Sequence, residues 1–327
     1  MVNGQTDNIF GFLNVYKPTG MTSHDVISVL RKITKIKQIG HAGTLDPFAQ
    51  GVLPVAIGKT TRLIEFLEGE KKYLAEITFG KSTDTYDCEG AVTAELHSAV
   101  TAPQIKKALK QFEGEILQMP PIYSAIKVKG KKLYEYARKG EEVAIEPRRV
   151  FIEKIELKAF DEKEQKAQVL IKCSKGTYIR SIAHDLGQNL GVGAHLSMLI
   201  RTQAGNFFVQ DAVPLDEIKI IQDVEKKLIN PICKIDLNRL EITEDEHKKI
   251  LMGQAITRSG LNSKNVTFDD VGLESPTYFD NSCFLNSLQY NKNNLQNYDF
   301  IILIYNNNIS AIAQIYGNQI RVKKVFI

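Results

Sequence analysis

A single carboxylate on a glycine-rich segment is the first feature of this sequence that could carry chemistry. Residues 40–47 read GHAGTLDP and place Asp46 between apolar neighbours, beside glycines that allow a ligand to approach the backbone closely. An ionised carboxylate in such a loop can act as a nucleophile or can stabilise positive charge on a substrate. The competing interpretation is that Asp46 only caps a turn before Pro47.

A second candidate is Arg180, at the end of the run KGTYIR in residues 175–180. The spacing of apolar residues predicts a helix that Thr177 caps and in which Arg180 falls in the first turn. The helix dipole disfavours a cation at that end, so a carboxylate or a bound anion beside Arg180 would explain its position. A solvated arginine is the alternative.

A basic stretch with interleaved tyrosines occupies residues 123–140, where Glu135 is the single acid. Its basic side chains are Lys127, Lys129, Lys131, Lys132, Arg138 and Lys139. Such cations can neutralise phosphates while aromatic rings stack on unpaired bases. The stretch therefore predicts contact with a nucleic acid, although a solvated basic loop would have the same composition.

Other functional classes are disfavoured by spacing and composition. The four cysteines lie far apart without a CxxC pair, and the six histidines show no HExxH spacing, so we expect neither a metal site nor a disulfide framework. The GKT at residues 58–60 could end a phosphate-binding loop of the pattern GxxxxGK[ST]. That pattern would need glycine at position 53, where this chain has Leu53. No apolar run is long enough to span a membrane and no secretory signal is visible, so we expect a cytoplasmic protein.

These residues need a scaffold, and periodicity predicts a mixed or antiparallel sheet flanked by helices, an α+β fold. Strands are predicted at residues 10–16, 52–57, 73–79, 150–160 and 167–174. A helix should begin at Thr22, which has capping-box spacing to Asp25. Further helices are expected near residues 63–67, at 105–112 behind Thr101, and after Thr177, whereas residues 38–51 are predicted to be a loop.

The C-terminal part differs in composition. A boundary is predicted near residues 230–237, followed by a polar helix at 244–252 and an Asn- and Ser-rich segment at 262–297. Apolar runs at 300–305, 309–316 and 320–326 are separated by turn residues, which predicts a small β domain.

Six blocks of this sequence, taken together, resemble the TruB family of tRNA pseudouridine synthases. They are GFLNVYKPTG at 11–20, HAGTLDPFAQG at 41–51, KKY at 71–73, YSAIKVKGKKLYEYARKG at 123–140, CSKGTYIR at 173–180 and GAH at 193–195. The resemblance covers roughly residues 10–210 and implies the pseudouridine synthase fold at 9–235, with a basic RNA clamp at 120–150. Residues 236–327 resemble a PUA-type RNA-binding domain more weakly, with an Asn-rich insertion at about 258–298.

The resemblance implies the active site. Asp46 matches the catalytic aspartate, Tyr73 the tyrosine whose ring stacks on the target uracil, and Arg180 the arginine that pairs with the aspartate. Tyr178 matches an active-site tyrosine beside that arginine. Leu199 matches an apolar residue that lines the pocket.

It also implies contacts with the RNA. His41 matches the histidine that enters the T loop, and Lys17 belongs to a block that supports the active-site strand. We group Lys17 with the substrate-binding residues, together with Lys131 and Lys132 of the basic stretch. Position 200 is Ile200, where the family pattern leads us to expect a basic residue.

The implied reaction converts uridine 55 in the T arm of tRNA to pseudouridine. No atom is added or lost, so no cofactor or metal is expected, and nothing in the sequence demands more than a monomer. Two alternatives stay open: an RNA chaperone that binds tRNA without chemistry, and a structural subunit of an RNA–protein particle. Conversion of the base distinguishes the enzyme from both.

Overall fold

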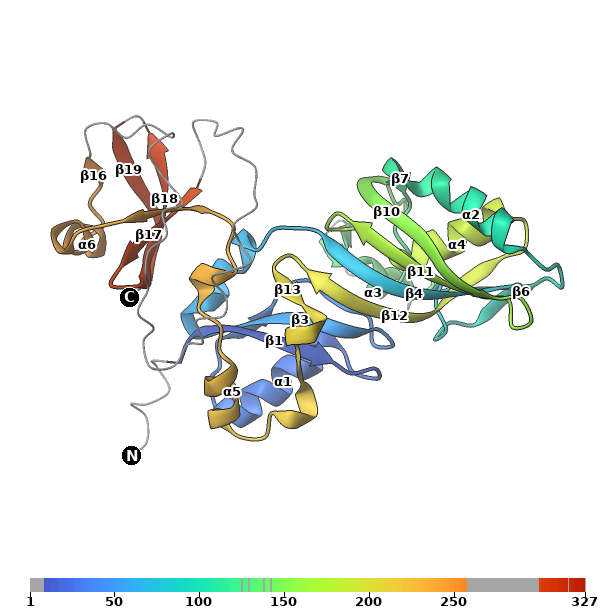
Figure 1. The fold of residues 1–327 in the computed structure, drawn as a ribbon, viewed down its shortest axis with the longest axis horizontal. Coiled ribbons are helices and arrows are strands. Elements are labelled where there is room, and N and C mark those ends of the chain that lie inside the picture. Colours follow the sequence, from blue (N-terminus) through green and yellow to red (C-terminus); the bar gives the residue numbers. More distant parts are fainter. Residues whose placement is uncertain are drawn as a thin grey trace.

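The computed structural model describes residues 9–257 and 300–326, apart from residues 125, 129, 138, 142 and 317 and the side chain of Tyr134. The Asn-rich insertion predicted at about 258–298 lies outside the described residues, as do Lys129 and Arg138 of the basic stretch. The described chain forms a large sheet with helices packed against it and a smaller C-terminal sheet (Figure 1).

Within the described residues, ten strands form a mixed sheet in the order β14-β1-β3-β12-β4-β11-β10-β7, with β2 paired to β3 and β13 to β12. Its strands are β1 (Gly11–Lys17), β2 (Ile39–His41), β3 (Gln50–Ile57), β4 (Lys71–Phe79), β7 (Gly114–Gln118), β10 (Arg148–Asp161), β11 (Lys166–Cys173), β12 (Ala194–Ala204), β13 (Phe207–Phe208) and β14 (Val213–Pro214). The pairs β1–β14 and β3–β12 are parallel and the others antiparallel. The predicted α+β fold with a mixed sheet is confirmed.

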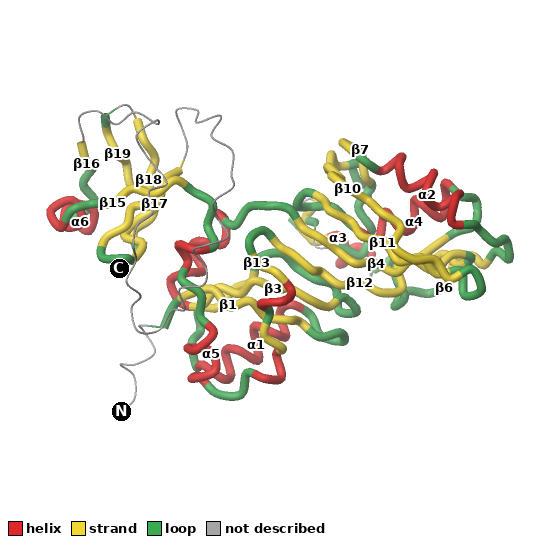
Figure 2. Tube along the Cα trace, viewed as in Figure 1, coloured by secondary structure: helices red, strands yellow, loops and turns green. Residues whose placement is uncertain are grey.

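The main helices pack on this sheet in two groups (Figure 2). Helices α1 (Ser23–Thr34) and α5 (Ile221–Lys227) close an apolar core with β1 and β3. Helices α2 (Ala102–Leu109) and α4 (Ile179–Asn189) close a second core with β4, β10, β11 and β12. β3 contributes to the first of these cores and β12 to the second, and the two strands are neighbours in the sheet. The loops next to these strands therefore meet between the two cores.

Local sequence explains why these elements start and how they face. Thr22 caps α1, with reciprocal hydrogen bonds between its side chain and backbone and those of Asp25, as predicted. In β4, Tyr73 and every second residue after it are buried, whereas Leu74 and every second residue after it are half-buried. This alternation gives the strand one face toward the core and one toward the outer surface.

Short elements complete the chain up to the C-terminal sheet. They are η1 (Gly58–Phe66), β5 (Lys81–Thr83), β6 (Val92–Glu95), η2 (Lys110–Phe112), β8 (Lys127–Val128), β9 (Lys131–Lys132), α3 (Leu133–Ala137), η3 (Val209–Asp211), η4 (Leu215–Glu217) and η5 (Pro231–Cys233). β5 pairs with β6, and β8 with β9. The basic stretch therefore forms a small hairpin followed by one helical turn.

Three local predictions need correction. The predicted loop at 38–51 contains β2, whose three residues are too short for periodicity to reveal. The helix predicted near 63–67 is the 3-10 helix η1, which begins earlier. Thr177 does not cap α4, because its hydroxyl donates to Ser174 O and Tyr178 occupies the N-cap position.

The C-terminal sheet has the order β15-β17-β18-β19-β16. Its strands are β15 (Asn238–Glu241), β16 (Ile256–Thr257), β17 (Phe300–Tyr305), β18 (Asn308–Tyr316) and β19 (Gln319–Val325), and α6 (Glu244–Leu251) packs beside them. The predicted apolar runs thus form the three central strands. Left-handed backbone at Asn306 and Asn307 makes the turn between β17 and β18.

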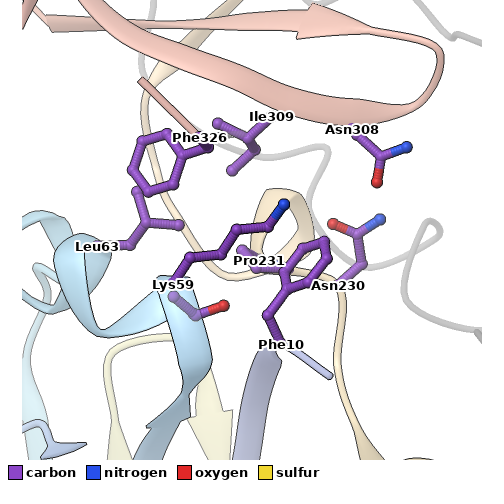
Figure 3. Close-up of a pocket in the computed structure, with 9 residues that line it drawn as sticks. Phe10, Lys59, Leu63, Asn230, Pro231, Asn308, Ile309 and Phe326 are labelled. Carbon is purple, nitrogen blue, oxygen red and sulfur yellow. The ribbon is translucent and has the colours of Figure 1, made fainter. Parts of the chain in front are cut away.

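This sheet is joined to the large one by a shared apolar core. Phe66 of η1 meets Phe300 edge-on at 5.1 Å between ring centroids, and Arg62 donates to Val325 O at 2.8 Å. A small pocket lies at the junction, with Phe10 and Lys59 on one side and Phe326 on the other (Figure 3). No helix among residues 9–257 and 300–326 is long and apolar enough to cross a membrane.

Candidate active site

The loop that carries Asp46 is fastened to the first strand and helix. Leu45 N donates to Ser23 Oγ at 2.9 Å, and Ser23 Oγ donates back to Leu45 O at 3.2 Å. On the other side of the carboxylate, Lys17 Nζ donates to Pro47 O at 3.1 Å. Both neighbours of Asp46 are therefore held in place, which fixes where its side chain projects.

Lys17 is a support for this loop. Its side chain is fully buried, and its ammonium also donates to Pro18 O at 2.8 Å and to Met21 O at 2.6 Å. Burial lowers the pKa of Lys17 to about 8, although the nearby Asp46 carboxylate opposes the shift. The ammonium thus supports the loop through carbonyls of three half-buried residues, and the grouping of Lys17 with the substrate-binding residues stays a prediction.

Arg180 holds the Asp46 carboxylate with two nitrogens. Arg180 Nε lies 3.0 Å from Asp46 Oδ2, and Nη2 donates to Oδ1 at 3.3 Å. The arginine is in the first turn of α4, as predicted, and its side chain is 6% exposed, whereas that of Asp46 is 32% exposed. A planar guanidinium matches a carboxylate in this way, and it leaves one side of Asp46 open to a substrate.

The groups around Asp46 have opposing effects on the pKa of its carboxyl. Burial raises the pKa of the Asp46 carboxyl above its usual value of 3.8, and the nearby Asp87 carboxylate adds to that effect. The Arg180 guanidinium favours the charged form and opposes both. Of the groups that favour the ionised carboxylate, Arg180 has the largest effect.

Sequence reasoning missed Asp87, which is the second carboxylate on Arg180. Its Oδ2 accepts a hydrogen bond from Arg180 Nη1 at 3.0 Å, and the residue is 3% exposed. Asp87 Oδ1 accepts from Thr85 Oγ1 at 2.6 Å and from Glu89 N at 3.0 Å. The acid-rich run TDTYDCEG at residues 83–90 contained this residue, but nothing local showed that it would reach α4.

Arg180 also organises the segment that leads into the basic stretch. Its Nη2 donates to Tyr123 O at 2.9 Å. Gln118, at the end of β7, accepts from Tyr178 N at 2.8 Å and donates to Tyr178 O at 3.0 Å. The Gln118 amide thus holds the N-cap residue of α4 from a distant strand, and no side chain among the described residues caps the helix as predicted for Thr177. Tyr178 itself is half-buried, and burial raises the pKa of its phenol.

Tyr73 and Leu199 form the apolar wall of the site from adjacent strands. Both are buried, at 6% and 5% exposed, on the inner faces of β4 and β12. Burial raises the pKa of the Tyr73 phenol to about 12, and the Arg201 guanidinium opposes this. The phenol is therefore neutral at neutral pH.

Arg201 is a further residue that sequence reasoning missed. It is fully buried on β12, and it donates to Val52 O at 2.7 Å and to Gly43 O at 3.0 Å. Its guanidinium therefore holds the other end of the loop that carries Asp46. Alternation along β12 could have revealed it, because residues 199 and 201 share a face and the intervening Ile200 points to the opposite one. The basic residue expected at position 200 would not have faced the active site.

His41 ends β2 at the rim of the same loop. Its Nδ1 is buried without a hydrogen-bond partner among the described residues, and burial lowers the pKa of the ring. In the basic stretch, Lys131 is exposed, Lys132 is half-buried, and Lys131 Nζ lies 5.8 Å from the Tyr136 ring centroid. In the described ranges, no group of three or more His, Cys, Asp or Glu side chains could hold a metal ion.

Two family models match the chain. Residues 31–179 match "TruB family pseudouridylate synthase (N terminal domain)" and residues 180–232 match "tRNA pseudouridylate synthase B C-terminal domain". The class of protein is thus a pseudouridine synthase, an isomerase.

Curated relatives narrow the class to one family. The chain is 47% identical to a tRNA pseudouridine synthase B from Caldanaerobacter subterraneus subsp. tengcongensis, over 81% of this chain and 93% of that protein. It is 46% identical to the protein of that name from Symbiobacterium thermophilum, over 77% and 85% of the two chains. The chain belongs to the TruB family.

Solved structures agree on the fold. A chain in the crystal structure of a Cbf5-Nop10-Gar1 complex superimposes with a TM-score of 0.66 at 25% identity, covering 97% of this chain and 85% of the other. A chain of an H/ACA RNP bound to a substrate RNA containing 2'-deoxyuridine gives a TM-score of 0.64 at 23% identity.

Proposed function

We propose that this protein converts uridine 55 in the T arm of tRNA to pseudouridine, with Asp46 as the catalytic carboxylate. The observation that carries the proposal is the two-point contact between Arg180 and a carboxylate that stays open on one side. The relatives named tRNA pseudouridine synthase B, which match over most of their length, support tRNA as the substrate.

The reaction breaks the bond between ribose C1′ and uracil N1 and rejoins C1′ to C5. The C5 proton leaves and N1 gains a proton, so the product is an isomer of the substrate. Cleavage of a glycosidic bond develops positive charge on the sugar, which an ionised carboxylate can stabilise or attack. Attack at C1′, attack at C6 of the base and formation of a glycal all require Asp46 in its charged form.

The apolar wall suits a reaction that must exclude water. A detached uracil beside a charged sugar would be lost if water reached C1′ first, and Leu199 and Tyr73 present little that would hold water there. The base must also be turned out of its loop, which costs a few kcal/mol. Stacking on the Tyr73 ring offsets about 1–3 kcal/mol of that cost.

The remaining predicted residues suit a larger RNA footprint. In the proposed complex, His41 lies where the T loop opens, and Lys131 and Lys132 face phosphates of the stem. Such contacts read the shape and charge of an A-form stem more than its sequence. We propose that residues 236–327 add a PUA-like RNA-binding unit to the catalytic unit at 9–235, and that the enzyme acts as a monomer.

The test compares the wild-type protein with Asp46→Asn on an unmodified tRNA, with pseudouridine mapped by chemical labelling. Asp216→Asn is the matched control, because it removes the same charge from an exposed position in η4. We expect conversion at one T-loop uridine by the wild type and the control, and none by Asp46→Asn. Binding without conversion by any of the three would leave an RNA-binding protein and would refute the proposal.

A further inference from the structure

Two cationic side chains meet beside Gly43, three residues before Asp46. An atom placed at the Cβ position of Gly43 would lie 3.1 Å from Lys71 Nζ and 3.3 Å from Arg201 Nη1. Gly43 has φ near +80°, which suits glycine, and a side chain at this position would crowd both cations. Gly43 is half-buried and the neighbouring Thr44 is exposed, so this part of the loop lies at the surface.

No acid neutralises this pair within the described residues. The guanidinium of Arg201 is fully buried on backbone carbonyls, and Lys71 Nζ has neither an ion pair nor a hydrogen bond there. The two acids nearest in sequence are already paired: Glu68 with Lys175 at 3.5 Å and Glu70 with Lys172 at 2.7 Å. Burial and the Arg201 charge lower the pKa of Lys71 to about 8.

Two like charges held this close together favour an anion beside them. Lys71 is half-buried and can contact such an anion, whereas the buried Arg201 contributes its field from below. Lys71 lies on the same face of β4 as Tyr73, two residues away, a step of about 6.6 Å along a strand. An anion bound to Lys71 would thus lie within one nucleotide of a base stacked on Tyr73.

We propose that Lys71, which lies beside Gly43 and is backed by Arg201, binds an RNA backbone phosphate adjoining the target uridine. The inference rests on the proposed function, because it takes the flipped nucleotide as the ligand. In this arrangement Lys71 binds the RNA backbone, while Asp46 and Tyr73 act on the sugar and base. A phosphate anchor of this kind positions a nucleotide without reading its sequence.

The test combines two deletions of charge in a double-mutant cycle. Lys71→Met removes the cation from the protein, and one uncharged methylphosphonate linkage removes a phosphate charge from a T-arm stem–loop RNA. The linkage is placed 5′ or 3′ of the target uridine in separate RNAs, and Kd is measured by filter binding in an Asp46→Asn background. Lys72→Met is the matched control, because it removes the same charge from the opposite face of β4. Lys71→Arg keeps the charge.

We expect Lys71→Met to weaken binding of the unmodified RNA and to flatten its salt dependence by about one phosphate contact, a slope change of ~0.7–0.9. One methylphosphonate should weaken binding by the wild-type Lys71 protein about as much, and should add nothing in Lys71→Met. Lys71→Arg should restore the slope, and Lys72→Met should not change it.

The proposal would be overturned if each methylphosphonate weakened RNA binding equally in the protein with Lys71 and in Lys71→Met. An unchanged salt dependence of Kd in Lys71→Met would also overturn it. These binding measurements need no turnover, so they separate the phosphate site from the proposed reaction. If the wild type bound the RNA with the predicted coupling yet formed no pseudouridine, the proposed function would fail while the phosphate site stood.

Discussion

Replacing Asp87 by asparagine removes one negative charge from the Asp46–Arg180–Asp87 cluster while almost preserving the shape of the side chain. Removing one partner of a buried ion pair costs about 3–5 kcal/mol. Arg180 keeps Asp46 and the carbonyls of Thr85 and Tyr123, and an amide oxygen can still accept from it. We therefore expect the lower end, a loss of about 3 kcal/mol in the free energy of unfolding.

The same substitution should move the pH dependence of the reaction. Burial raises the pKa of Asp46 and the Asp87 charge raises it further, so removing that charge lowers the pKa. In the proposed reaction, activity requires ionised Asp46 and is lost as the pH falls through this pKa. The acid limb of kcat/KM should therefore shift to lower pH in Asp87→Asn. Looser positioning of Arg180 should also reduce kcat by up to ~10²-fold, the usual result of a misplacement near 1 Å.

Urea unfolding measures the stability change, and release of tritium from C5-labelled uridine in tRNA measures the rate at each pH. Glu115→Gln serves as the control, because it removes a carboxylate from an ion pair with Arg149 whose side chains are 63% and 78% exposed. That pair should contribute no more than ~1 kcal/mol. A variant of Asp87 with wild-type stability and an unmoved acid limb would show that Asp87 does not act through Arg180.

Two further predictions concern the base and the RNA stem. Tyr73→Phe should keep RNA affinity but lower kcat, because the ring still stacks while the neutral phenol that could pass on the C5 proton is gone; full turnover by this variant would leave stacking as the only role of Tyr73. Replacing Lys131 and Lys132 together by alanine should raise KM and flatten its salt dependence by ~0.7–0.9 per lost phosphate contact, and an unchanged slope would exclude contact there.

The fold was predictable where a local pattern decides the structure. Alternation in residues 73–79 and the capping pair of Thr22 and Asp25 gave elements that the structure confirms. β2 was missed because three residues that include Gly40 show no period. The start of α4 was mispredicted because no local side chain in the described part of the chain caps it, and Gln118, sixty residues earlier in the chain, holds its N-cap residue Tyr178.

The site was predictable only in part, for a related reason. Asp46 and Arg180 stand in motifs, and the structure brings them together. Asp87 and Arg201 act through partners far away in sequence, and the carbonyls that hold Arg201 and Lys17 carry no sequence signature. Contacts between side chains and distant backbone follow from the completed sheet, which local patterns do not describe.

The place of β12 in the sheet has a consequence for how the enzyme is made. β3 and β4 are close in the chain, yet they are not paired with each other, because the later strand Ala194–Ala204 lies between them. A ribosome adds about 5–20 residues per second, so the nascent chain must wait several seconds with two unpaired strand edges. Pairing so distant in sequence also makes folding slow. The Asp46 loop, Tyr73 and Arg201 come together only at that late step, so a truncated or stalled chain would not assemble the proposed catalytic centre.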